Sequence, residues 1–226
     1  MSEAESFINE VTEEVRRDKL FILFRRYGWI PVVLIVLIVS GTGYNEWRKA
    51  QDTKAAQALG DAIAVALENP EAADRAAALG AITANSAGTG QFLELLKAAE
   101  LAAAGEKENA LAILDDVAAN SETPEIYRSL AELKAVILRG GDQERTERMA
   151  VLDQLAIPGS PFRVIAMEQK ALALIEYGNK DEAIALLARI LDEPDRTQAL
   201  RQRTQQLIVA LGGTLSDDRT QPDEDR

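Results

Sequence analysis

The sequence predicts an all-α protein, in which a single N-terminal transmembrane helix is followed by a solenoid of helical hairpins. Three observations support this prediction: an uncharged apolar run near the N-terminus, Ala- and Leu-rich segments separated by Gly and Pro, and two hairpin patterns that repeat each other. No stretch shows the sustained alternation of polar and apolar residues that is typical of β-strands.

The apolar run covers residues 27–44 and contains no charged side chain. A bilayer core about 30 Å thick needs about 20 helical residues, with a lower limit of about 17. Arg25-Arg26 and Arg48-Lys49 flank the run, and Tyr and Trp residues lie near both of its ends, as is typical of spans. A cleavable signal peptide and a buried element of a soluble domain are the alternatives. The long polar segment before the run disfavours the first, and the flanking arginines disfavour the second.

Lys and Arg are more numerous before the run than after it, which predicts an N-terminus in the cytoplasm. The expected domains are a cytoplasmic segment at 1–26, a transmembrane helix at 27–44 and a large helical domain at 45–212. Residues 213–226 are expected to form a disordered acidic tail, because they are rich in carboxylates. In a bacterium this topology corresponds to a single-pass inner-membrane protein with a periplasmic C-terminal domain.

Turn and cap residues divide the large domain into helices. Asn69-Pro70, Thr123-Pro124 and Ser160-Pro161 predict helix starts, and Gly105 and Gly178 predict left-handed helix ends. A loop is expected at 85–90, where two glycines follow Asn and Ser. The predicted helices are 45–68, 70–85, 91–104, 106–119, 124–139, 142–156, 161–177, 180–192 and 195–211.

Two helical hairpins share the same residue types at the same offsets. In each, small residues face each other across a turn glycine, and aliphatic residues follow on the second helix. The first contains Ala98, Leu101, Gly105, Ala110, Leu114 and Val117, and the second contains Ala171, Leu174, Gly178, Ala183, Leu187 and Ile190. This pattern resembles the tetratricopeptide repeat. Residues 127–155 are expected to supply a weaker pair between them, with Ala131, Leu133 and Leu152 in the core. A generic antiparallel helical bundle is the alternative.

Composition excludes several kinds of chemistry. The chain has no Cys and no His, which rules out Cys/His metal sites, Ser-His-Asp triads and Cys nucleophiles. Its net charge of −12 disfavours binding to nucleic acid. The adjacent acids Asp115-Asp116 point to different sides of a helix, and Asp217-Asp218 fall in the tail. We therefore predict no catalytic, cofactor-binding or metal-binding residue, no small-molecule substrate and no enzymatic activity.

The order of these parts is similar to that of the YfgM-type proteins, ancillary subunits of the bacterial Sec translocon. The residues that carry the resemblance are 13–20 before the span, Tyr27-Gly28-Trp29 at its start, Asn45-Glu46-Trp47-Arg48 after it, and the hairpins within 88–117 and 167–190. The resemblance implies a non-enzymatic, membrane-anchored interaction protein near the translocon, with periplasmic chaperones and secreted clients as partners.

A curved solenoid of helices offers a concave groove for peptides or a partner domain. The acidic composition predicts acidic groove walls that favour basic or unfolded segments. The alternative function is a structural scaffold or assembly factor for another inner-membrane or envelope complex.

Overall fold

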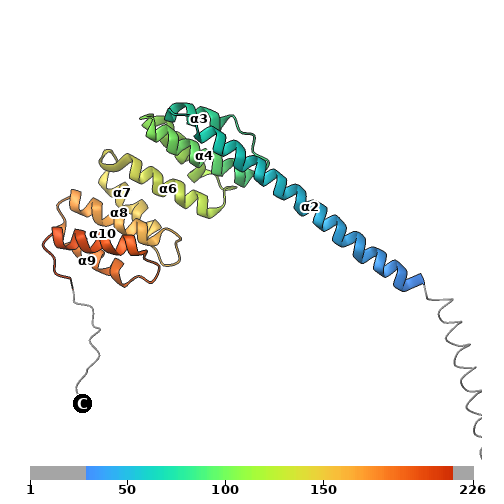
Figure 1. The fold of residues 1–226 in the computed structure, drawn as a ribbon. Helices are drawn as coiled ribbons and strands as arrows, with labels where there is room; N and C mark the ends of the chain where they lie inside the picture. Colours follow the sequence, from blue (N-terminus) through green and yellow to red (C-terminus); the bar gives the residue numbers. More distant parts are fainter. Residues whose placement is uncertain (1–28, 216–226) are drawn as a thin grey trace, which may run out of the picture. The chain divides into compact units, whose positions relative to one another are not determined.

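The described residues, 29–215 of the computed structural model, form α-helices and one 3-10 helix, with no β-strand among them (Figure 1). The chain divides into two compact units, Met1–Asp61 and Ala62–Arg226. The predicted cytoplasmic segment 1–26 and residues 216–226 of the predicted tail lie outside the described residues. The elements are α2 (Trp29–Leu67), α3 (Ala72–Gly80), α4 (Ala87–Ala103), α5 (Lys107–Ala119), α6 (Glu125–Arg139), η1 (Gly140–Asp142), α7 (Arg145–Leu155), α8 (Arg163–Glu176), α9 (Lys180–Asp192) and α10 (Gln198–Ala210).

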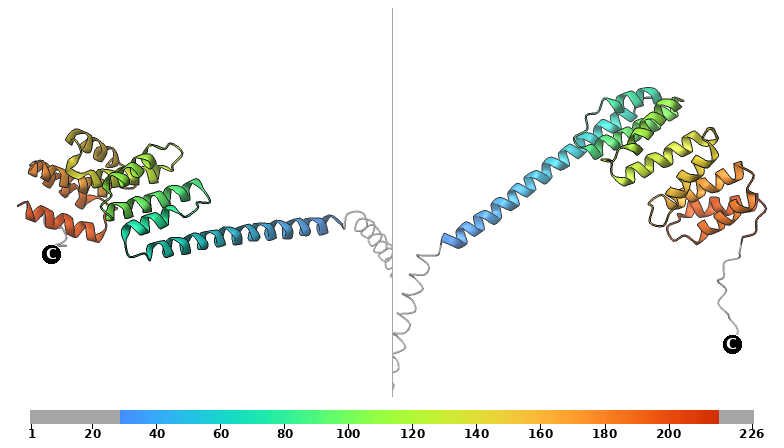
Figure 2. Two further views of the ribbon diagram at one scale, coloured as in Figure 1. Left: turned by 90° about the horizontal axis from the view of Figure 1, so that it is seen from above. Right: turned by 180° about the vertical axis from the view of Figure 1, so that it is seen from behind.

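Helix α2 is continuous over 39 residues and passes through the predicted boundary between residues 44 and 45 (Figure 2). The large apolar side chains at 34–39 are 56–64% exposed. The first two residues of the predicted span at 27–44 lie outside the described part of the chain. Among residues 29–215, no helix combines the length and the hydropathy that a membrane crossing requires.

In the second unit, helices that follow one another along the chain pack side by side, from α3 against α4 to α9 against α10. In the two repeated hairpins, α4–α5 and α8–α9, the small residues at the crossings are almost completely buried, as predicted. These residues are Ala98, Ala110, Ala171 and Ala183. Because alanine has no side chain beyond Cβ, the paired helices approach closely enough to exclude water between them.

The turn glycines of the two hairpins adopt the left-handed conformation that the sequence predicts, with φ of 81° at Gly105 and 79° at Gly178. In each turn, the N–H of the residue after the glycine donates to a carbonyl in the last turn of the preceding helix. The N–O distances are 2.9 Å from Glu106 to Leu101 and 2.8 Å from Asn179 to Leu174. These are Schellman caps, which satisfy carbonyls that have no partner within the helix.

The middle pair, α6–α7, uses a different turn and a charged core position. Ala131, Leu133 and Leu152 are buried as predicted, and the turn contains η1. Arg148 of α7 is also buried, and it forms an ion pair with Glu176 at the end of α8. Its guanidinium lies 5.9 Å from the centre of the Tyr177 ring. This charged contact joins the middle pair to the second repeated hairpin.

The observed starts of α4 and α3 differ from the predicted ones. Helix α4 begins at Ala87, inside the expected loop at 85–90, because the Ser86 hydroxyl accepts a bond from the Thr89 N–H at 3.2 Å. Asn69 does not cap α3, which begins at Ala72. Its side-chain amide instead donates to the carbonyl of Ala66, near the end of α2, at 2.8 Å.

The starts of α6 and α8 are also shifted toward the C-terminus. Pro124 is the residue that precedes α6, and the Thr123 hydroxyl is buried without a bonding partner. Helix α8 begins at Arg163, two residues after Pro161. The Ser160 hydroxyl accepts a long bond of 3.4 Å from the N–H of Phe162. In both cases the proline lies in the connection and is not the first residue of the helix.

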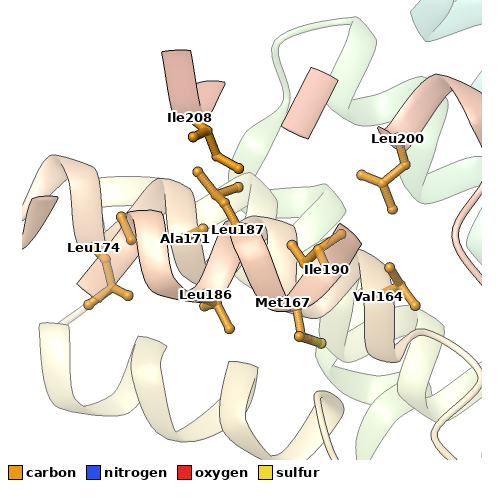
Figure 3. Close-up of a cluster of buried hydrophobic side chains, with 10 residues drawn as sticks. Val164, Met167, Ala171, Leu174, Leu186, Leu187, Ile190, Leu200 and Ile208 are labelled. Carbon is orange, nitrogen blue, oxygen red and sulfur yellow. The ribbon is translucent and has the colours of Figure 1, made fainter. Parts of the chain in front are cut away.

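The largest core cluster lies between α8, α9 and α10. Figure 3 shows Leu187 among Ala171, Ile190 and Ile208, all of them almost completely buried. Two further clusters lie along the solenoid, one between α4, α5 and α6 and one between α6, α7 and α8. Each cluster is shared by successive helices, so every hairpin depends on its neighbours for burial of its apolar face.

Candidate interaction groove

Helices α6, α8 and α10 and the connection between α7 and α8 border three adjacent hollows, which we call the α6–α10 groove. The hollow at α6 has a volume of about 280 Å³, the one at the starts of α8 and α10 about 420 Å³, and the one between α8 and α10 about 520 Å³. The first two share residues 159–161, and the last two share Arg203. The hollows therefore follow one another along the same part of the solenoid.

The α6 end of the groove is acidic. Glu125, Ser129 and Glu132 line it at spacings of four and three residues, which place them on one side of the helix. Neither carboxylate forms an ion pair among the described residues. Burial raises the pKa of the Glu132 carboxyl above its ordinary value of 4.5, and the nearby Arg128 guanidinium offsets part of that effect.

Replacement of Glu132 by glutamine is expected to raise the unfolding temperature at pH 7 by less than about 2 °C. The folded state raises the pKa of this carboxyl, so ionisation costs the folded state more than the unfolded state. That cost is present above the folded-state pKa and is lost as the pH falls through 4.5. The gain from Glu132→Gln should therefore disappear below about pH 4.5. Circular dichroism melts at pH 7 and pH 4 test this, with the exposed Glu122→Gln as the control. An equal gain at both pH values would contradict it.

Accessible aliphatic side chains lie along the whole groove. Ile157 and Ile165 are 55% and 44% exposed, although both are large hydrophobic side chains. Ile157 lies in the connection between α7 and α8, and Ile165 lies in the first turn of α8. Leu172 and Leu207 line the hollow between α8 and α10. Exposed aliphatic side chains beside a hollow are typical of surfaces that bind other proteins.

The α10 end contains an ion pair in which only the carboxylate is buried. The Glu168 side chain of α8 is 8% exposed, whereas the Arg203 side chain of α10 is 56% exposed. Arg203 donates from Nε to Glu168 Oε1 at 2.9 Å and from Nη2 to Oε2 at 3.0 Å. These bonds raise the pKa of Arg203 above its ordinary value. The paired geometry fixes the guanidinium over the hollow and links α8 to α10.

The expected acidic walls are present at the α6 end of the groove, whereas Arg203 lies beside Glu168 at the other end. The groove lining carries charges of both signs. The carboxylates are Glu125, Glu132, Asp195 and Glu168, and the arginines are Arg163 and Arg203. At the adjacent acids 115–116, Asp115 pairs with Arg139 at 2.5 Å. The pair Asp217-Asp218 lies outside the described residues. Within 29–215, no cluster of three acidic, His or Cys side chains suited to a metal is found.

Sequence reasoning named no groove residue, although one signal pointed to Glu168. This residue lies four positions after Val164 and three before Ala171, both of which are buried. A carboxylate at such a position is on the apolar face of its helix and needs a partner from elsewhere. The partner, Arg203, lies 35 residues further along the chain, and its identity depends on how the hairpins stack.

The stacked hairpins, the small residues at their crossings and the left-handed glycines between their helices define a tetratricopeptide-like helical repeat. The family model described as a tetratricopeptide repeat-like domain matches residues 23–212, and the chain belongs to this family. A comparison with curated proteins found no match, and a comparison with solved structures found none either.

Membership of this family confirms the predicted tetratricopeptide-like fold. It disfavours the alternative, a generic antiparallel helical bundle. Repeats of this kind typically act as non-catalytic scaffolds, whose extended surfaces bind other proteins. The chain is accordingly a protein–protein interaction module, and the α6–α10 groove is its candidate binding surface.

Proposed function

We propose that this protein is a membrane-anchored interaction module that holds segments of partner proteins in the α6–α10 groove. The observation that carries the proposal is the line of three adjacent hollows, along which Ile157 and Ile165 are exposed. Apolar side chains of a bound segment would cover these isoleucines and remove their surface from water.

The apolar first part of α2 supports membrane anchoring. Its side chains at 34–39 are exposed, and no partner within the described chain covers them. Tyr44 ends the run and Trp47 follows it, at the position where aromatic side chains prefer the membrane interface. In the proposed topology the chain crosses the bacterial inner membrane once at 27–44, with the N-terminus in the cytoplasm and the repeat domain in the periplasm.

The partner proposal rests on the order of the parts. A charged N-terminal segment, an apolar run and a tetratricopeptide-like domain follow one another here, as in the YfgM-type proteins. We propose that the chain is an ancillary subunit of the Sec translocon, linking secreted clients to periplasmic chaperones. Its position beside the channel would give the groove access to extended chains before they fold.

Site-specific photocrosslinking in living cells tests the partner. A photoreactive amino acid at Gln169 or Gln206, which line the hollow between α8 and α10, is expected to capture translocon subunits, chaperones or secreted clients. Asn109, exposed on α5, is the control position. Capture of a single respiratory or division complex from the groove would replace this proposal with the scaffold alternative.

Topology has a separate test. Alkaline phosphatase fused after residue 215 should be active, because the enzyme matures only outside the cytoplasm, and the protein should stay in the membrane pellet after carbonate extraction. Deletion of residues 29–44 is expected to release the protein from that pellet. An inactive fusion, or full release of the intact chain by carbonate, would refute the proposed anchor without affecting the groove.

A further inference from the structure

We infer that the α6–α10 groove selects an extended segment with opposite charges at its two ends: a basic side chain at α6, an apolar centre and an acidic side chain at Arg203. This inference rests on the proposed function, because it specifies the chemistry of the partner that the same groove holds. Three independent features of the groove support it.

The acidic end is available to a cation from outside the chain. Glu125 and Glu132 line the same hollow and make no ion pair with a described residue. Arg128 lies on the same helix and attracts the Glu132 carboxylate, but it does not line the hollow. A lysine or arginine of a partner would therefore meet two carboxylates there, and the partly buried Glu132 would regain some of the charge stabilisation that burial removes.

The opposite end presents unused donors to an anion. Glu168 accepts bonds from Nε and Nη2 of Arg203, and Nη1 makes no hydrogen bond within the described part of the chain. Glu168 is buried, so the half-exposed guanidinium is the charged group that a partner meets first. A guanidinium offers five N–H donors in a fixed plane and can bind two carboxylates along different edges.

The hollow between these ends is mainly apolar, with Ile165 and Leu200 in its lining. It also contains Asp195 and Arg163, and Arg163 pairs with Glu193. The middle hollow shares residues 159–161 with the acidic hollow and Arg203 with the last one. Ile165 lines this hollow, and Ile157 lines the acidic one beside it. The amide side chains of Gln169 and Gln206 line the last hollow and can bond to an extended backbone, which has no partners of its own. A segment that follows the groove therefore meets Glu125 and Glu132 first, then the mainly apolar middle hollow, and then Arg203.

A series of fluorescent peptides tests the inference on the full chain in detergent. All peptides share one alternating Leu-Ser centre and differ only in their end residues. Two carry Lys at one end and Asp at the other, in either order, and the others carry Lys at both ends, Asp at both ends or Ser at both ends. By fluorescence anisotropy, at least one of the Lys/Asp peptides should bind about three- to tenfold more tightly than each of the other three.

Two variants assign the preference to the proposed ends. The double change Glu125→Gln with Glu132→Gln should remove the advantage that Lys gives, while Glu108→Gln on α5 should not. The double change Arg203→Gln with Glu168→Gln should remove the advantage that Asp gives, because it deletes the guanidinium without leaving a buried carboxylate unpaired. Arg201→Gln, a neighbour that does not line the hollows, is its control. Circular dichroism checks that each variant is folded.

The outcomes separate this inference from the proposed function. Equal binding of all five peptides, or a preference that survives both variants, overturns the charge selection and leaves the groove as a binding surface. If no peptide binds but groove positions crosslink to proteins in cells, the inference fails and the proposed function stands. If neither binding nor crosslinking occurs, both fail.

Discussion

Replacing Leu187 by alanine is expected to lower the free energy of unfolding by about 2 to 5 kcal/mol. Leu187 is 0% exposed and lies in the core cluster shared by α8, α9 and α10. The substitution removes buried methyl groups and leaves a cavity that the surrounding helices close only in part. Figure 3 shows why closure is limited: Ala171 and Ile208 lie beside Leu187, and both are themselves buried. Urea denaturation followed by circular dichroism measures the loss.

A second expected effect of Leu187→Ala concerns the shape of the urea denaturation curve. In a solenoid each repeat is stabilised by its neighbours, so a weakened C-terminal hairpin can unfold before the rest. Leu187→Ala should therefore broaden the urea transition or divide it in two. The exposed Val209→Ala on α10 is the control, with an expected change within about 0.5 kcal/mol. A loss below about 1 kcal/mol for Leu187→Ala would contradict the packing described here.

Local sequence signals predicted the hairpins because the relevant forces are local. Glycine at 105 and 178 ends a helix in the same way wherever the helix lies, and alanine at a crossing permits close packing with any neighbour. The loop expected at 85–90 shows the limit of this reasoning. Two glycines cost helix stability of about 1 kcal/mol each, but the Ser86 cap and the packing of α3 on α4 outweigh that cost.

The groove could not be predicted in the same way. Its lining comes from α6, α8 and α10, which are separated by whole helices in the sequence and are brought together by the stacking of the hairpins. Net charge predicted acidic walls, but the ion pairs of the solenoid determine which charges face the hollows. Glu168 was recognisable as a buried polar position, whereas its pairing with Arg203 requires the fold.

Replacing Arg203 by alanine is expected to cost about 2 to 4 kcal/mol, since the change leaves the Glu168 carboxylate buried without its partner. The Glu168 side chain is only 8% exposed, so water cannot fully replace the two lost hydrogen bonds. The loss should exceed that of Arg201→Ala on the same helix. It is measured by urea denaturation at pH 7, and a loss below about 0.5 kcal/mol would show that the pair behaves as an exposed one.

A double-mutant cycle separates the value of the ion pair from the cost of breaking it. If the loss arises from the unpaired carboxylate, Arg203→Ala combined with Glu168→Met should be more stable than Arg203→Ala alone, because methionine has a similar volume and no charge to bury. Because no charge is left unpaired between α8 and α10, the double variant should fold. The α10 end of its groove then lacks the guanidinium that the ion pair holds in place. Such a variant would keep the solenoid and lose the affinity for acidic segments, which distinguishes the structural contribution of Arg203 from its contribution to binding.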